Sequence, residues 1–126
     1  MSVLNPLHDL SALQARIAHC TGLVVVCYCA AWCDTCTQYR GDFERLAQRL
    51  PQHAFVWVDI EDSPELLGEE DVENFPTLAI QGAEGNRFFG TLLPYISHLE
   101  RLVEQLQDDA GHAVVAGPPL LRSAVA

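Results

Sequence analysis

Short apolar runs alternate with amphipathic stretches along the first half of the chain. Residues 23–29 (LVVVCYC) and 54–60 (AFVWVDI) are continuous runs rich in β-branched side chains, which is typical of strands buried on both faces. Between them, residues 33–50 carry apolar side chains at alternating steps of three and four, so this stretch predicts an amphipathic helix that Pro51 ends. Residues 9–19 show the same helical spacing ahead of the first run.

The second half predicts a hairpin and a last helix. Residues 77–81 (TLAIQ) and 87–90 (RFFG) read as strands, and the five residues between them are rich in turn formers. Residues 94–107 again place apolar side chains on one helical face. Before the hairpin, residues 63–65 (SPE) predict the start of a short helix, with Ser63 as its cap.

This order of elements predicts an α/β fold. Strands joined through helices form a parallel core, and the hairpin adds an antiparallel edge. We therefore expect a central mixed sheet of about four strands, flanked by helices on both faces. Residues 1–107 would form one domain, and residues 108–126 a loosely ordered C-terminal tail. The alternative is that the apolar pairs at 114–115 and 120–121 dock on the body.

Charge narrows the range of partners. The 126 residues carry 17 acidic and 7 basic side chains, a formal charge of −10, and every basic residue is Arg. Phosphate backbones and anionic lipid repel such a chain, which argues against nucleic-acid and membrane partners. The first 20 residues lack the pattern of a secretory signal, so we expect a cytoplasmic protein, and we expect it to be a monomer.

Five cysteines lie in the first third of the chain: Cys20, Cys27, Cys29, Cys33 and Cys36. An odd number of cysteines clustered in one region is typical of redox or metal chemistry rather than of structural disulfides spread along the chain. Cys27 and Cys29 are two apart on a strand, so their side chains point to the same face. They are either small core residues, a second redox pair, or part of a four-sulfur metal site with the other two. We predict no metal and no other cofactor.

Cys33 and Cys36 sit where a buried strand becomes a helix. The unpaired N–H groups and the dipole at a helix N-terminus stabilise an anion, so the Cys33 pKa is expected to fall and its thiolate to attack. Cys36 follows one helical turn later on the same side. The spacing therefore predicts a Cys33–Cys36 disulfide, with Cys33 attacking and Cys36 resolving.

The chain resembles the thioredoxin family over about residues 9–107. The family's Trp-Cys-x-x-Cys corresponds to Trp32-Cys33-Asp34-Thr35-Cys36. Its cis-proline before a strand corresponds to Phe75-Pro76-Thr77, and Gly90 matches a family glycine in the hairpin.

The resemblance implies a thioredoxin-like fold and a thiol–disulfide oxidoreductase acting on protein disulfides. Cys33 and Cys36 would be catalytic, and an electron-donating reductase would restore them. Substrate would contact Trp32, Asp34, Thr35, Phe75 and Pro76. The alternative is a thioredoxin-like binding or assembly factor with weak or no redox turnover.

The acidic run at residues 59–73 leads directly into Phe75-Pro76 and holds eight acids and no base. It is either a solvated surface or, in a thioredoxin-like fold, a patch beside the catalytic face. In the second case, Glu70, Asp71 and Glu73 would steer positively charged partners to the site.

Four positions depart from the family where its chemistry depends on them. Cys27 replaces the family's buried carboxylate, which helps to deprotonate the resolving cysteine, and Cys29 replaces its second active-site tryptophan. Asp34-Thr35 replaces Gly-Pro, and Asp34 places a negative charge beside Cys33 that opposes thiolate formation.

With no base at position 27, we expect the mixed disulfide between Cys33 and a model disulfide to persist longer than in a thioredoxin that has the carboxylate. Quenched-flow trapping measures its lifetime. Resolution as fast as in such a thioredoxin would contradict the expectation.

Overall fold

A computed structural model describes residues 3–6, 8–20, 22–68, 70, 75–82, 85–107 and 114–121 of the chain. It contains these elements in order: β1 (Val3–Leu4), α1 (Leu10–Ala18), β2 (Val24–Cys29), α2 (Asp34–Arg49), β3 (Ala54–Asp59), η1 (Pro64–Leu67), β4 (Thr77–Gln81), β5 (Asn86–Thr91) and α3 (Ile96–Gln107). Within the described residues, no helix is long and apolar enough to cross a membrane.

The strands form one mixed sheet in the order β1-β3-β2-β4-β5. β3 pairs in parallel with β1 and β2, while β4 pairs antiparallel with β2 and with β5. The predicted α/β class and the antiparallel hairpin edge are confirmed. β1 is a fifth strand that the sequence did not reveal, because two residues are too few to show a period.

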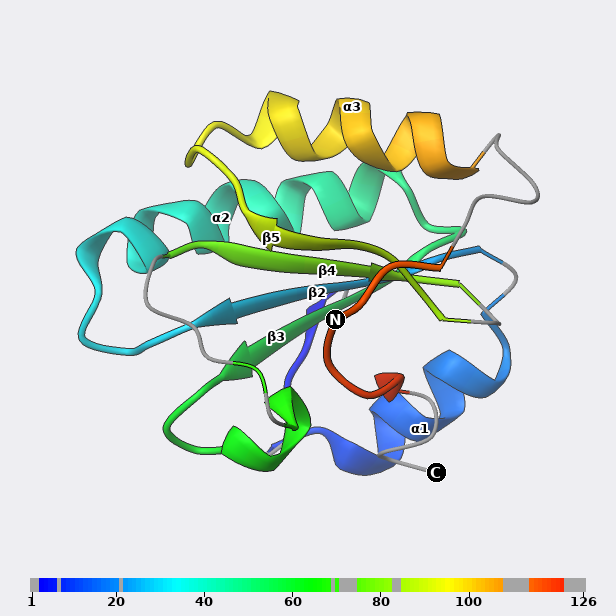
Figure 1. Cartoon of the computed structure of the whole chain (residues 1–126), viewed down its shortest axis with the longest axis horizontal. Helices are drawn as coiled ribbons and strands as arrows, with labels where there is room; N and C mark the ends of the chain where they lie inside the picture. The colour runs from blue at the N-terminus through cyan, green and yellow to red at the C-terminus, as the bar shows by residue number, and fades with distance from the viewer. Residues whose placement is uncertain are drawn as a thin grey trace.

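The sheet is covered on both faces (Figure 1). α2 and α3 lie against one face, and α1 and η1 lie against the other. The pleat of β2 divides its side chains accordingly, since Cys27 and Cys29 pack in the cluster under α2 and α3, whereas Tyr28 packs in the opposite cluster. The two cysteines therefore share the face that α2 covers, as the sequence predicts.

η1 is a single four-residue 3₁₀ turn rather than an α-helix. Ser63 precedes it, but its side chain makes no capping hydrogen bond, so the predicted cap is wrong in that respect. Gly68 ends the turn with φ at +63°, a left-handed conformation that glycine adopts without strain. Residues 69 and 71–74 lie outside the described residues, and with them Asp71 and Glu73 of the acidic run.

Residues 114–121 dock on the sheet, which is the alternative considered for the tail. Val115 bridges Asn86 of β5, and its N–H donates to the Asn86 carbonyl at 2.8 Å. The buried Gln81 amide of β4 holds the next stretch, since Nε2 donates to the Pro119 carbonyl at 3.1 Å and Oε1 accepts the Leu121 N–H at 2.9 Å. Residues 108–113 and 122–126 lie outside the described residues.

Leu121 anchors this segment and gives a test of it. Its side chain is 2% exposed in the cluster beneath α1. We expect Leu121→Ala to lower the free energy of unfolding by about 2–4 kcal/mol, measured by urea denaturation, because it leaves a cavity. The matched control Leu93→Ala, at a position 61% exposed, should stay within about 0.5 kcal/mol of the parent. Equal effects of the two substitutions would show that the segment does not pack.

Candidate active site

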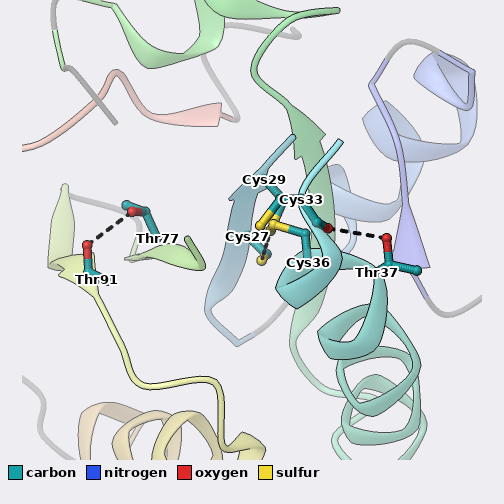
Figure 2. Close-up of a disulfide and its surroundings, with 7 residues drawn as sticks. All are labelled: Cys27, Cys29, Cys33, Cys36, Thr37, Thr77 and Thr91. Carbon is teal, nitrogen blue, oxygen red and sulfur yellow. Dashed lines mark hydrogen bonds between the residues drawn. A yellow bond between two sulfur atoms is a disulfide. The ribbon is translucent and has the colours of Figure 1, made fainter. Parts of the chain in front are cut away.

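A buried disulfide joins Cys29, the last residue of β2, to Cys36, the third residue of α2. Figure 2 shows the bond beneath the first turn of the helix, with Cys27 beside it. The two Cα atoms are 5.8 Å apart, within the range of about 4.4–6.8 Å that disulfides span. The side chains of Cys29 and Cys36 are only 1% and 2% exposed.

Cys33 is a free thiol at the N-cap of α2. Its side chain is half-buried, packs against the core cluster that contains the disulfide, and makes no capping hydrogen bond. Its carbonyl accepts hydrogen bonds from the Thr37 N–H at 3.2 Å and the Thr37 hydroxyl at 3.3 Å, which fixes the start of the helix (Figure 2). Cys33 therefore lies at the N-terminal end of the helix, and its sulfur forms neither a disulfide nor a capping hydrogen bond.

The structure thus gives Cys36 a different partner from the predicted one. A Cys33–Cys36 bond was expected, and the sulfur of Cys36 is instead bonded to that of Cys29. The physical reason is that Cys36 points inward, onto the sheet face where the pleat also directs Cys29. The sequence spacing showed that Cys27 and Cys29 point to the same face of the sheet. It does not show whether Cys36 will bond to a strand cysteine or to Cys33.

Cys27 is the third sulfur on this face. Its Sγ lies 3.8 Å from that of Cys29, and its side chain has no solvent exposure. Burial raises the pKa of the Cys27 thiol far above its ordinary value, and the positive charge of Arg40 offsets only part of this effect. Cys27 is therefore a protonated thiol packed in the core. Across the described residues, no group of three or more Cys, His, Asp or Glu side chains is arranged to hold a metal ion.

Two of the predicted substrate-contacting residues, Trp32 and Phe75, contact each other. Trp32 is 69% exposed and meets the ring of Phe75 edge to face, with centroids 5.6 Å apart. The Phe75–Pro76 peptide bond is cis, as the resemblance implied. Phe75 packs against the same core cluster as Cys33, so an aromatic pair and a half-buried thiol share one region of the surface.

Asp34 and Thr35 form the first two residues of α2, between the two helix cysteines. Asp34 is exposed and Thr35 is half-buried. The Asp34 carboxylate therefore lies at the positive end of the helix dipole, where a negative charge is favourable, and within the reach of a bound partner.

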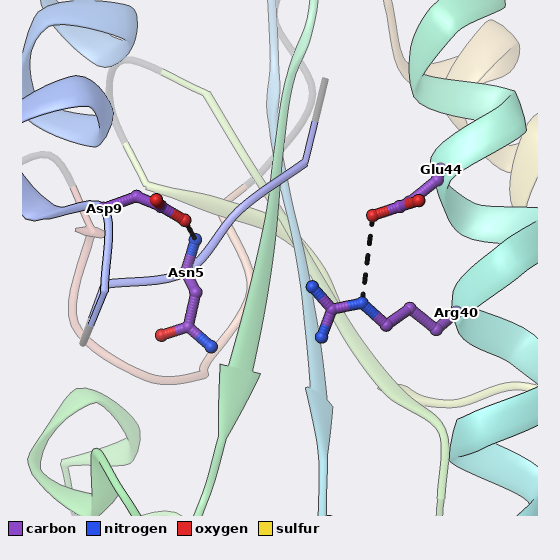
Figure 3. Close-up of polar contacts among 4 residues, drawn as sticks. All are labelled: Asn5, Asp9, Arg40 and Glu44. Atoms are coloured by element: carbon purple, nitrogen blue, oxygen red, sulfur yellow. Dashed lines mark hydrogen bonds and ion pairs between the residues drawn. The ribbon is translucent and has the colours of Figure 1, made fainter. Parts of the chain in front are cut away.

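A cavity of about 470 Å³ reaches Cys36 from a different direction. It is bounded by Asn5, His8 and Asp9, by the β2–α2 connection and by Arg40 of α2, and Cys36 is the member of the disulfide that lines it. Arg40 lies 5.2 Å from the centroid of the Trp57 ring and pairs with Glu44 at 3.8 Å, while Asp9 accepts the Asn5 N–H at 3.1 Å (Figure 3). One sulfur of the buried disulfide thus has a polar cavity beside it.

Comparison with known proteins identifies relatives of this chain. A family model described as thioredoxin matches residues 7–92. A thioredoxin of Chlamydia trachomatis is 35% identical over 72 residues, which cover 56% of this chain and 71% of that protein. A thioredoxin of the snake Ophiophagus hannah is 27% identical over 70 residues, or 55% of this chain and 67% of that protein.

Solved structures show the same fold. The thioredoxin of Trichomonas vaginalis superposes with a TM-score of 0.59 at 23% identity, covering 83% of this chain and 97% of that one. A thioredoxin of Nicotiana alata superposes with a TM-score of 0.70 at 16% identity, covering 84% of this chain and 93% of that one.

The different environments of the two free thiols near the disulfide should separate them chemically. We expect iodoacetamide to label Cys33 in the native oxidised protein and to leave Cys27 unlabelled until the chain is unfolded in guanidinium, because Cys27 is buried and protonated. Peptide mass spectrometry measures both labels. Native labelling of Cys27 at the rate of Cys33 would contradict this description of the site.

Proposed function

Because this chain belongs to the thioredoxin family, we propose that it is a thiol–disulfide oxidoreductase that acts on protein disulfides through Cys33 and Cys36. One observation carries the proposal: a half-buried free thiol stands at the N-cap of α2, and a cysteine that forms disulfides follows one turn behind it. Backbone N–H groups at a helix N-terminus favour the thiolate that attacks.

The reaction begins with the reduced protein. The Cys33 thiolate attacks one sulfur of a substrate disulfide, and the other substrate sulfur leaves as a thiolate that takes up a proton. Cys36 then loses its proton and attacks the Cys33 sulfur, which frees the second substrate thiol. Two electrons and two protons pass from the dithiol to the substrate. A protein that donates electrons, a reductase in the general sense, returns the dithiol to its reduced state.

Substrate would bind on the side of Cys33 that carries Trp32 and Phe75. Their edge-to-face pair offers an apolar wall to an extended segment, and Pro76 lies buried behind it. Asp34 and Thr35 border the same thiol from the helix. These five residues form the proposed substrate-binding surface.

We propose that the protein acts as a monomer in a reducing cytoplasm. The support is the clustering of cysteines at one site rather than as staples along the chain. The net charge of −10 favours positively charged protein partners. Of the three acids expected to steer them, Glu70, Asp71 and Glu73, Glu70 lies among the described residues.

The proposal is tested by reduction of insulin with dithiothreitol as the electron donor. We expect Cys33→Ser to abolish catalysis, because the attacking sulfur is lost, and Cys36→Ser to accumulate a mixed disulfide with insulin at Cys33, visible on a non-reducing gel. Cys20→Ser, which removes a half-buried thiol next to the Leu23 and Gln52 carbonyls, should retain wild-type turnover.

Turnover unaffected by Cys33→Ser would refute the assignment. No turnover in the wild-type protein, together with stable capture of protein partners, would favour the thioredoxin-like binding factor instead.

A further inference from the structure

Two cysteines are candidate disulfide partners of Cys36. Cys33 lies one turn before it on α2, and Cys29 lies on the sheet face beneath it and is bonded to it. We propose that Cys29 is a second resolving cysteine: it takes Cys36 over from Cys33, so that the oxidised protein stores its disulfide in the core and presents Cys33 again as a free thiol. This inference rests on the proposed function and assigns a catalytic role to a residue that function does not use.

The transfer is an exchange of partners with no net oxidation. Turnover leaves a Cys33–Cys36 disulfide and a Cys29 thiol. The Cys29 thiol loses its proton and attacks the Cys36 sulfur, the Cys29–Cys36 bond forms, the Cys33–Cys36 bond breaks, and Cys33 leaves as a thiolate. One disulfide and one thiol are present before and after. The step therefore needs no external oxidant or reductant.

Burial separates the two forms of the oxidised site. The sulfur atoms of Cys29 and Cys36 belong to side chains 1% and 2% exposed, while Cys33 is half-buried at the helix end. An external thiol must reach a disulfide sulfur to reduce it. In the stored form an external thiol can approach the bond only past nearly buried side chains or through the cavity that Cys36 lines, so reduction runs faster through the Cys33 thiolate, which attacks Cys36 and re-forms the exposed disulfide.

Cys27 does not compete for this role, although its sulfur lies 3.8 Å from that of Cys29. It lies one pleat further into the sheet, between Trp57 of β3 and Leu78 of β4. Cys29, in contrast, ends β2 next to the first turn of α2.

The disulfide map of the oxidised full-length protein is the first test. Arg16 and Arg40 flank all five cysteines, so trypsin alone leaves them on one peptide. Chymotrypsin cleaves after Tyr28 and Trp32, and Asp-N cleaves before Asp34. In separate digests, chymotrypsin leaves Cys29 on residues 29–32 and both Cys33 and Cys36 on residues 33–39, while Asp-N separates Cys33 from Cys36; tandem mass spectrometry after alkylation reads the links.

We expect the wild-type map to show Cys29 linked to Cys36 and Cys33 alkylated in stoichiometric amount. In Cys29→Ala, the link should move to Cys33–Cys36 and the alkylation of Cys33 should disappear. The matched control Cys27→Ala removes the neighbouring sulfur from the same strand face and should keep the wild-type map. The wild-type map shows which sulfurs are bonded even where a variant fails to fold.

The rate of reduction distinguishes a relay from a fixed structural disulfide. In oxidised Cys33→Ser, the Cys29–Cys36 bond should be reduced by dithiothreitol more slowly than in the wild type, by about tenfold or more, because the internal attacker is gone. A fixed disulfide would be reduced at the same rate in both proteins.

A wild-type map with Cys33–Cys36 as its only link, or equal reduction rates in the two proteins, would overturn the relay and leave the proposed function standing. Insulin turnover that survives Cys33→Ser would overturn the proposed function whatever the map shows. Turnover by Cys29→Ala together with the expected maps would support both.

Discussion

The first turn of α2 decides which sulfur atoms can meet. The apolar stripe of α2 faces the sheet, and the third residue of the helix belongs to that stripe. Cys36 is that residue, and Cys29 is the strand residue at the same place on the sheet face. The periods of the helix and of the strand, 3.6 and 2, together bring two buried sulfurs into contact and leave the sulfur at the helix end outside.

Most of the fold could be predicted from the chain, since strands buried on both faces and a strongly amphipathic helix have clear patterns. The hairpin and α3 follow from local signals as well. What the pattern does not contain are contacts between distant segments. The Gln81 side chain forms hydrogen bonds with the backbone of residues about forty positions later in the chain. A polar residue within a strand gives no local signal of such a distant partner. The pairing of β1 with β3 depends in the same way on contacts beyond its own two residues.

The site was predictable in its parts and not in its bonding. The motif around Cys33 and Cys36 was accessible from the sequence, and the cis peptide before Pro76 from the family resemblance, whereas the contact between the Trp32 and Phe75 rings was not predicted. The partner of Cys36 was not, because the spacing of a C-x-x-C motif favours the sequence neighbour, whereas packing decides in three dimensions. Cys27 stands where the family resemblance places a buried carboxylate. Burial keeps the Cys27 thiol neutral, so this position carries an uncharged sulfur in place of a charged group.

The bridge between Val115 and Asn86 has a consequence for the behaviour of the whole sheet. Unpaired strands at the border of a sheet are templates on which other chains add, and this sheet has two such borders. β1 limits one by its two-residue length, and on the other side the returning C-terminal segment engages the backbone of β5 where that strand begins. A segment remote from the sulfur chemistry thereby covers the start of this edge strand and hinders edge-to-edge association of the chain with its own copies.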